Sequence, residues 1–209
     1  MIKGALLVFT RAPVPGQTKT RLIPILGTQG AAEFHQAILL KTLADAKASN
    51  YETTEIWCEP DINHLFLQKC SLDFSSTLQI QKGNDLGEKM HHAIDVTLLT
   101  NNFVVLIGSD CPEISTDILN QSYQALSNGK EAVLGPSSDG GYYLIGLNKP
   151  NPVIFQDISW GECDVAERTR QNFIRLGLDY VELEELADID TPDDYHKYVG
   201  HPQPSFKIC

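Results

Sequence analysis

The 209-residue sequence predicts an α/β fold, a three-layer sandwich with a mixed, mostly parallel central sheet. Short apolar runs typical of strands alternate with stretches of helical periodicity along the chain. Such alternation is typical of βαβ units, which place helices on both faces of a parallel sheet. The segment Gly135–Gly141, between two strand-like runs, leaves no room for a crossover helix. We therefore expect those two strands to be a hairpin or to lie at different positions in the sheet.

The predicted strands are short runs rich in aliphatic and aromatic residues. They are Gly4–Thr10, Thr53–Cys58, Thr77–Gln81, Phe103–Ile107, Glu131–Leu134, Tyr142–Leu147 and Asp179–Leu183. The first contains the continuous apolar run Leu6-Leu7-Val8-Phe9, which a strand buried on both faces requires. The run from Met1 to Phe9 is too short for a signal peptide, and a charged loop follows it.

The predicted helices lie between these strands. They are Thr28–Ser49, Ile62–Cys70, Leu86–Leu99, Thr116–Ser127, Val165–Leu176 and Pro192–Val199. The first has a regular apolar side at helical spacing, formed by Ala32, His35, Leu39, Leu43 and Ala46. The last begins at Pro192, with Thr191 suited to the N-cap and two aspartates favourable to the helix dipole.

Composition narrows the class of protein. The length suits a single domain over residues 1–209, and the 42% of hydrophobic residues can fill a core. No apolar run approaches the roughly 20 residues needed to cross a bilayer, so we expect no membrane span and a cytoplasmic location. The five scattered cysteines, without a C-x-x-C pair, favour neither a zinc site nor a disulfide framework.

Charge is unevenly distributed along the chain. The formal net charge of -11 would repel DNA or RNA, so we expect no nucleic-acid partner. Residues 11–21 nevertheless carry three basic residues and no acid, whereas residues 182–194 carry seven acidic residues and no base. A basic loop combined with an acidic segment suits a small, metal-bound anion.

The basic loop follows the first predicted strand. Two prolines and Gly16 fix its path and allow close backbone approach to a ligand. Arg11, Lys19 and Arg21 can surround a polyphosphate, with hydroxyl donors from Thr18 and Thr20. The alternative is a solvated basic loop. It is not a Walker A loop, because Thr18 stands where that motif requires glycine directly before lysine.

Acidic residues lie at two other strand ends. Asp110 directly follows the most apolar strand, where a carboxylate can hold Mg²⁺ or merely turn the chain ahead of Pro112. Ser115 is the better candidate to cap the next helix, which favours the metal role for Asp110. Asp188 and Asp190, two residues apart, face one side of an extended segment and repel unless a cation or a basic group lies between them. A divalent metal shared with Asp110 is the simplest resolution.

The remaining loop contains Asp139-Gly140-Gly141. The two glycines allow a ligand to approach the backbone closely, but Asp-Gly is also a common signal for a plain turn. The residues alone favour neither reading.

In combination these segments resemble a family of uncharacterised bacterial transferases in the nucleotide-diphospho-sugar transferase superfamily, which has the GT-A fold. Its members usually carry a glycosyltransferase designation and are similar to phospholactate guanylyltransferase and molybdenum cofactor guanylyltransferases. The matching segments occur in the expected order: Phe9–Gly16 with Lys19–Leu22, Gly108–Pro112, Gly135–Leu144 and Asp188–Asp194.

The resemblance implies roles for particular residues. The loop with Arg11, Pro13, Gly16, Thr18, Lys19, Thr20 and Arg21 would bind the nucleotide phosphates, together with Ser109. Asp110 would be the principal ligand of Mg²⁺ or Mn²⁺, with Asp188 and Asp190 as the second source of carboxylates. Asp139, Gly140 and Gly141 would border the acceptor. One departure is that Gly161-Glu162-Cys163-Asp164 follows Trp160 where relatives usually have a Ser-Thr pair. If this segment lines the acceptor pocket, it implies either a different acceptor or reduced activity.

Three functions follow as hypotheses. The first is a metal-dependent glycosyltransferase that acts on a nucleotide sugar and a small-molecule acceptor, with Lys19, Arg21 and Asp110 as catalytic residues. The second is a nucleotidyltransferase that releases pyrophosphate from a nucleoside triphosphate, and the third is a nucleotide-binding module without catalysis. His91 and His92 are expected to be surface or core residues, and Cys111 has no neighbour in sequence that would activate it. Phe206 and Ile208 suggest a contact with another copy of the chain.

Overall fold

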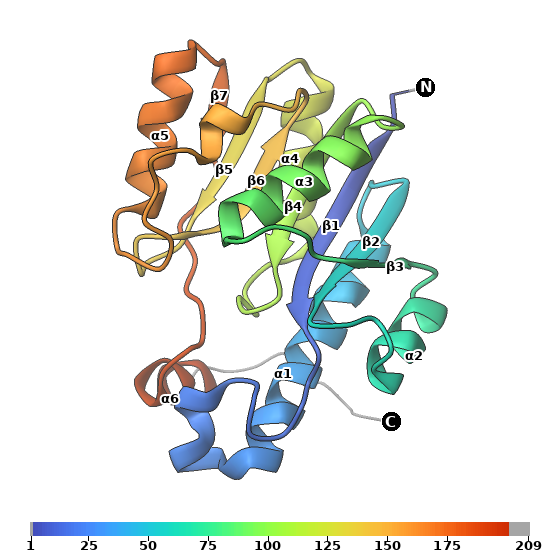
Figure 1. Cartoon of the computed structure of the whole chain (residues 1–209), viewed down its shortest axis with the longest axis vertical. Helices are drawn as coiled ribbons and strands as arrows, with labels where there is room; N and C mark the ends of the chain where they lie inside the picture. The colour runs from blue at the N-terminus through green and yellow to red at the C-terminus, as the bar shows by residue number, and fades with distance from the viewer. Residues whose placement is uncertain (1, 201–209) are drawn as a thin grey trace.

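The computed structural model describes residues 2–200 and has helices on both faces of a central sheet (Figure 1). The strands run in the order β3-β2-β1-β4-β6-β5-β7. Their bounds are β1 Gly4–Arg11, β2 Thr53–Glu59, β3 Thr77–Ile80, β4 Phe103–Gly108, β5 Ala132–Pro136, β6 Tyr142–Leu147 and β7 Tyr180–Glu182. Only β6 runs antiparallel to its neighbours, β4 and β5. The predicted mixed, mostly parallel sheet is confirmed, and β5 and β6 form a hairpin.

Two apolar layers hold the helices to the sheet. The helices are α1 Ile23–Ala48, α2 Leu65–Asp73, α3 Leu86–Leu98, α4 Thr116–Ser127, α5 Val165–Leu176 and α6 Pro192–Gly200. Side chains alternate along β1, so Leu6 and Val8 face the layer that holds α1, α2 and α4. Ala5, Leu7 and Phe9 face the opposite layer, where α3 and α5 pack. The continuous apolar run of the first strand thus serves both layers.

A third apolar cluster lies beyond the carboxyl end of the sheet. It joins Leu22 and Ala31 to Ile189, with Phe34, Tyr195 and Tyr198 packed around them. The rings of Phe34 and Tyr195 meet edge to face at 5.1 Å. This cluster seats α6 against the start of α1, which lies below the sheet in Figure 1. The segment before α6 is therefore held next to the end of β1.

Some element ends differ from the prediction for local reasons. The Asp61 side chain accepts a hydrogen bond from the backbone of Asn63, and this turn delays α2 to Leu65 instead of Ile62. The first helix begins earlier than expected, at Ile23, but Gly27 (φ 70°) breaks it, so the regular part starts at Thr28 as predicted. Two short 3₁₀ helices, Thr20–Leu22 and Pro152–Phe155, were not predicted.

The predicted caps are confirmed. Ser115 Oγ accepts a hydrogen bond from Ile118 N at 3.4 Å, and Thr191 Oγ1 accepts one from Asp194 N at 3.3 Å. In return, the Asp194 carboxylate accepts a hydrogen bond from Thr191 N at 2.9 Å, so the two residues form a reciprocal cap at the start of α6. These bonds fix where the segment containing Asp188 and Asp190 ends.

No helix within residues 2–200 combines the length and the apolar character that crossing a bilayer requires. Cys58, Cys70, Cys111 and Cys163 are free thiols. Phe206, Ile208 and Cys209 lie outside the described residues, so the expected contact between copies stays a prediction.

Candidate functional site

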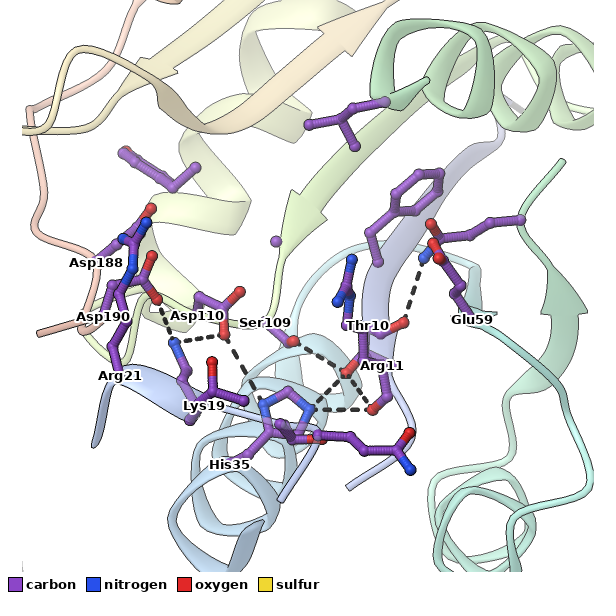
Figure 2. Close-up of a pocket in the computed structure, with 18 of the residues that line it drawn as sticks. Thr10, Arg11, Lys19, Arg21, His35, Glu59, Ser109, Asp110, Asp188 and Asp190 are labelled. Carbon is purple, nitrogen blue, oxygen red and sulfur yellow. Dashed lines mark hydrogen bonds and ion pairs between the residues drawn. The ribbon is translucent and has the colours of Figure 1, made fainter. Parts of the chain in front are cut away.

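A cleft of about 700 Å³ opens at the carboxyl edge of the sheet. β1 and β4 are adjacent parallel strands, so the loop after β1 and Asp110 after β4 meet there. The segment with Asp188 and Asp190 closes one side, and the start of α3 lies on the opposite side. Figure 2 shows these side chains pointing into a common space. Sequence-distant segments singled out by their charge thus form one site.

Lys19 is the centre of the charged cluster. Its ammonium lies 2.7 Å from Asp110 Oδ1 and 2.9 Å from Asp190 Oδ1, and it donates to the Ile189 carbonyl at 2.6 Å (Figure 2). The side chain is 4% exposed, whereas those of Asp110 and Asp190 are about half exposed (48% and 49%). All three ammonium donors are therefore used, and a basic group lies between carboxylates that were expected to share a metal.

The backbone of Lys19 is in the left-handed region, at φ 48° and ψ 46°. A non-glycine residue there carries a conformational cost that neighbouring interactions must offset. Burial alone would lower the pKa of Lys19, but the carboxylates of Asp110 and Asp190 raise it above its usual value. The lysine is consequently charged at neutral pH.

The pKa of Asp110 is also shifted by charged neighbours in this cluster. Burial opposes its ionisation, yet the Lys19 ammonium holds its pKa below the usual range. Asp188 shows the opposite balance, because burial and the carboxylates of Asp110, Asp139 and Asp190 raise its pKa to about 7. One lysine therefore leaves the acidic side of the cleft with excess negative charge.

A backbone hydrogen bond fastens the acidic segment to Asp110, just after β4. Ile189 N donates to Asp110 O at 3.1 Å, and Ile189 itself is buried at 2% exposure. Because Ile189 is anchored, the flanking Asp188 and Asp190 are both held at the cleft wall. The i, i+2 spacing thus serves to place an apolar anchor between two carboxylates.

Two guanidinium groups complete the basic side. Arg11 and Arg21 line the cleft, and neither guanidinium has a hydrogen-bond or ion-pair partner within residues 2–200. In Figure 2 the guanidinium of Arg11 lies in the open part of the cleft. Arginines without protein partners are available to bind phosphate oxygens in a bidentate way.

The other residues of the predicted phosphate loop differ in their positions. Gln17, Thr18 and Thr20 line the cleft, but Pro13 and Gly16 are not part of its wall. The Thr18 hydroxyl, expected to face a ligand, instead donates to Ala12 O at 2.8 Å and accepts from Val14 N at 3.2 Å. In this structure Thr18 shapes the loop, and the free donors come from the arginines.

Asp139 forms a turn through its own side chain. Its Oδ1 accepts hydrogen bonds from Ser137 Oγ at 2.6 Å and Gly141 N at 2.9 Å. Asp139, Gly140 and Gly141 are not part of the cleft wall, although Asp139 is close enough to raise the pKa of Asp188. The geometry favours a structural turn over a ligand-binding role for this loop.

Replacing Gly140 with Ala is expected to destabilise the fold by more than about 3 kcal/mol. Gly140 has φ +92°, and a Cβ atom there would collide with the carbonyl of Cys163. Gly129→Ala is the matched control, because its φ is +101° but nothing lies within 4 Å of the added atom. Urea unfolding should show a loss of about 1–2 kcal/mol for the control. Equal losses in the two variants would contradict the proposed collision.

His35 is a site residue that the sequence pattern did not reveal. It lies on α1, is 2% exposed, and was assigned to the apolar side of that helix. Its Nε2 is 3.1 Å from Arg11 O and 3.2 Å from Thr10 Oγ1, and the Ser109 hydroxyl donates to Thr10 Oγ1 at 3.0 Å. Nδ1 lies 3.8 Å from Asp110 Oδ1. The sequence held one signal for this role: His35 is the polar residue on a helix side that is otherwise apolar, between Ala32 and Leu39.

The far end of the cleft was also missed. Glu59, Gln81 and Lys89 line it, and Lys89 Nζ is 2.6 Å from Glu59 Oε2. Gln81 Nε2 donates to the carbonyls of Thr10 and Trp57, at 3.2 and 2.9 Å. No motif marks these residues in the sequence, because they come from β2, α3 and the end of β3.

Cys111 is buried beside Asp110, and burial raises the pKa of its thiol to about 12. Since the pKa is raised, thiolate is scarce at pH 8 and forms only as the pH approaches 12. We expect Cys111→Ala to retain activity, and iodoacetamide at pH 8 to modify exposed Cys163 well before Cys111. Mass spectrometry of the alkylated native protein checks the order. Rapid loss of activity together with Cys111 labelling would contradict it.

Three carboxylates of the cleft, those of Asp110, Asp188 and Asp190, are the candidate ligands for Mg²⁺ or Mn²⁺. Within residues 2–200, no three His, Cys, Asp or Glu side chains are spaced as a preformed metal site. Their chemistry is nevertheless suitable, because such ions prefer carboxylate oxygens, and the carboxylates of Asp110, Asp188 and Asp190 line the same cleft. The residues therefore fit a divalent ion in kind, with Lys19 as the cation between Asp110 and Asp190.

A second cleft, of about 530 Å³, lies on the other side of the start of α3. Its wall includes Trp160 and Phe155, and Gly87 allows the Trp160 ring to pack closely on α3. His91 contributes to this wall, while His92 lies against Trp57 at 6.1 Å between ring centroids. Gly161-Glu162-Cys163-Asp164, which departs from the family pattern, forms no part of the wall of the 700 Å³ cleft or of the 530 Å³ cleft.

Comparisons with known proteins bear on this site. Residues 42–162 match the model of a family described as "Uncharacterized protein conserved in bacteria (DUF2064)". A search of curated proteins returns no match to the sequence. Among solved structures, a provisionally named nucleotide-diphospho-sugar transferase from Desulfovibrio desulfuricans G20 is 32% identical, with a TM-score of 0.86. The match covers 95% of this chain and 87% of that one.

More distant structures share the fold. CMP:2-keto-3-deoxy-manno-octonic acid synthetase, solved in complex with CTP, is 8% identical, with a TM-score of 0.59 and coverage of 95% of this chain and 97% of that one. Rv0371c from Mycobacterium tuberculosis H37Rv, solved in complex with manganese, is 12% identical, with a TM-score of 0.53 and coverage of 96% and 99%. At these identities the likeness shows the arrangement of the elements. The predicted nucleotide-diphospho-sugar transferase-like fold is confirmed.

Proposed function

The chain belongs to the bacterial family DUF2064, and from this membership and its charged cleft we propose that it is a transferase acting on a nucleotide-linked phosphate donor. The observation that carries the proposal is the cluster of Lys19 with Asp110 and Asp190, flanked by Arg11 and Arg21. A site that only bound anions would not need three carboxylates beside its cations. A metal-bound phosphate donor uses both charges.

The basic and the acidic residues of the cleft have different roles in this proposal. Arg11 and Arg21 hold phosphate oxygens, and Lys19 stabilises the charge that develops on the departing phosphate. Asp110, Asp188 and Asp190 are the residues that would hold Mg²⁺ or Mn²⁺. When bound, the ion would supply Lewis-acid neutralisation of the diphosphate. Such catalysis relies on positioning and electrostatics, so it needs no protein nucleophile.

Glycosyl transfer from a nucleotide sugar is the first candidate reaction. It is supported by the relative with 32% identity, which spans 95% of this chain and carries a sugar-transferase name. The bond between the anomeric carbon and the phosphate oxygen would break, releasing a nucleoside diphosphate, as the acceptor oxygen bonds to that carbon.

Nucleotidyl transfer is the second candidate, and the basic loop favours it. Three cationic side chains, Arg11, Lys19 and Arg21, come from one loop, which suits the higher charge of a triphosphate. The CTP-bound synthetase with the same fold is an example of a protein that holds such a ligand. Here the acceptor oxygen would bond to the α-phosphorus, and pyrophosphate would leave.

Incubation with Mg²⁺ and a panel of donors distinguishes the candidates. Nucleoside diphosphate release from a nucleotide sugar supports glycosyl transfer, and pyrophosphate release from a nucleoside triphosphate supports nucleotidyl transfer. Each donor should be tested with a mixed panel of small-molecule acceptors, because the acceptor is unidentified. Nucleotide binding that survives Asp110→Ala, without turnover of any donor, would instead favour a binding module and overturn the proposal.

A further inference from the structure

His35 occupies a position that core packing does not explain. It is 2% exposed on the buried side of α1, in line with Ala32 and Leu39. An aliphatic residue would fill such a position without removing an imidazole from water. A buried polar side chain of this kind is stabilised only when its polar atoms are paired.

Only one ring nitrogen of His35 is paired. Nε2 lies 3.1 Å from the Arg11 carbonyl, which can only accept, so this nitrogen carries the proton of the neutral ring. Nδ1 then presents a lone pair, and it is buried without a hydrogen-bond partner within the described residues.

The unpaired nitrogen faces the charged cluster. Nδ1 is 3.8 Å from Asp110 Oδ1, the same oxygen that lies 2.7 Å from the Lys19 ammonium. At this spacing a single donor atom can lie within hydrogen-bond distance of both acceptors. Figure 2 shows the ring between the Arg11 backbone and Asp110. One edge of the ring thus contacts the phosphate loop, and the other edge faces Asp110.

We propose that His35 both orients and completes a cation site: Nε2 fixes the ring on the Arg11 carbonyl, so that Nδ1 and Asp110 Oδ1 together receive the divalent cation bound at the end of β4. The ring couples the start of the basic loop to Asp110, and a shift of either is transmitted to the other. This role rests on the proposed function in one respect, that the cleft binds a divalent ion with phosphate.

Three substitutions separate the two edges of the ring. Asn places a polar atom on Cγ, where His carries Nδ1, whereas the longer Gln reaches the position of Nε2. His35→Leu retains neither. Thr42→Val is the control, because Thr42 is also buried on α1 and bonds only to Ile38 O at 3.1 Å, away from the cleft.

The affinity for Mn²⁺ with inorganic pyrophosphate should be measured by titration calorimetry, with urea unfolding of each variant in parallel. We expect His35→Leu and His35→Gln to lose about 10–100-fold in affinity, as for other residues that orient metal ligands. His35→Asn should recover at least about half of that loss on a logarithmic scale, and Thr42→Val should match the unaltered protein. The inference would be overturned if the loss of affinity in each variant paralleled its loss of free energy of unfolding. It would also be overturned if His35→Gln had the same affinity as the unaltered protein.

A second measurement does not depend on ligand binding. Ring ¹⁵N resonances of His35 in the free protein should show protonated Nε2 and unprotonated Nδ1. Asp110→Asn should shift the Nδ1 resonance, and an unchanged resonance would overturn the coupling. If the unaltered protein does not bind Mn²⁺ with pyrophosphate, the proposed function fails, and these resonances alone decide the role of His35.

Discussion

Asp110→Asn is expected to reduce the rate of transfer by about a thousandfold while leaving the protein folded. Asp110 is the carboxylate that faces both Lys19, at 2.7 Å, and His35 Nδ1, at 3.8 Å. An amide keeps the size of the side chain but removes the charge that the ammonium and a divalent ion require. Initial rates with the donor that the panel assay identifies, at saturating Mg²⁺, measure the effect. Metal-dependent nucleotide affinity should fall in the same variant.

Asp45→Asn is the matched control for Asp110→Asn. Asp45 also pairs with a lysine, Lys41 at 2.8 Å, and accepts a hydrogen bond from Thr116, but neither residue lines the cleft. Its loss should lower stability and leave the rate within about twofold, as expected for a change outside the site. If both variants lost activity equally, the effect would belong to folding rather than to the cleft.

Lys19→Met is expected to change catalysis and metal binding in opposite directions. Transfer should fall by about 10²–10³-fold, because the cation that stabilises the leaving phosphate is gone. Affinity for Mn²⁺ alone should rise, because Asp110 and Asp190 lose the ammonium that now lies 2.7 and 2.9 Å from them. Electron paramagnetic resonance of free Mn²⁺ measures the second effect. Weaker Mn²⁺ binding would contradict the placement of the ammonium where a metal would bind.

The same substitution should cost stability. It removes a buried ammonium and leaves Ile189 O without its donor, but the two carboxylates are about half exposed (48% and 49%). We therefore expect a loss of about 1–3 kcal/mol, below the range for a fully buried pair. Lys41→Met is the control, since Lys41 also bonds a carboxylate, that of Asp45, and the carbonyl of Ile114. It should lose similar stability but retain transfer activity and Mn²⁺ affinity.

Most strands of the sheet were predictable, because a strand that is buried on both faces has a continuous run of apolar residues in the sequence. β1 packs against helical layers on both of its faces, so all of its central residues are apolar. The run Leu6, Leu7 and Val8 therefore predicts a buried strand from the sequence alone. The two 3₁₀ helices leave no such record, because segments as short as Thr20–Leu22 show no periodicity. The hairpin of β5 and β6 was one of two open alternatives, since a short loop limits the connection but not the pairing.

The site was predictable in its charges and only partly in its contacts. The basic loop and the carboxylates were recognisable as strand-end clusters, and the structure brings Lys19, Asp110 and Asp190 together. That Lys19 would lie between them was not predictable, because it depends on a left-handed backbone and on a partner 171 residues away. His35 was missed for a related reason. Helical periodicity identifies a buried position but not the loop that the position faces.

The attachment of Ile189 to Asp110 has a consequence for the order in which the protein matures. Residues 4–182 contain every strand of the sheet, so a chain emerging from the ribosome can assemble the sheet before Asp188 and Asp190 are available. Lys19 can pair with Asp190 only after that later segment has reached the carboxyl edge of the sheet. The acidic side of the cleft is thus completed by a segment that is synthesised after every strand within residues 2–200.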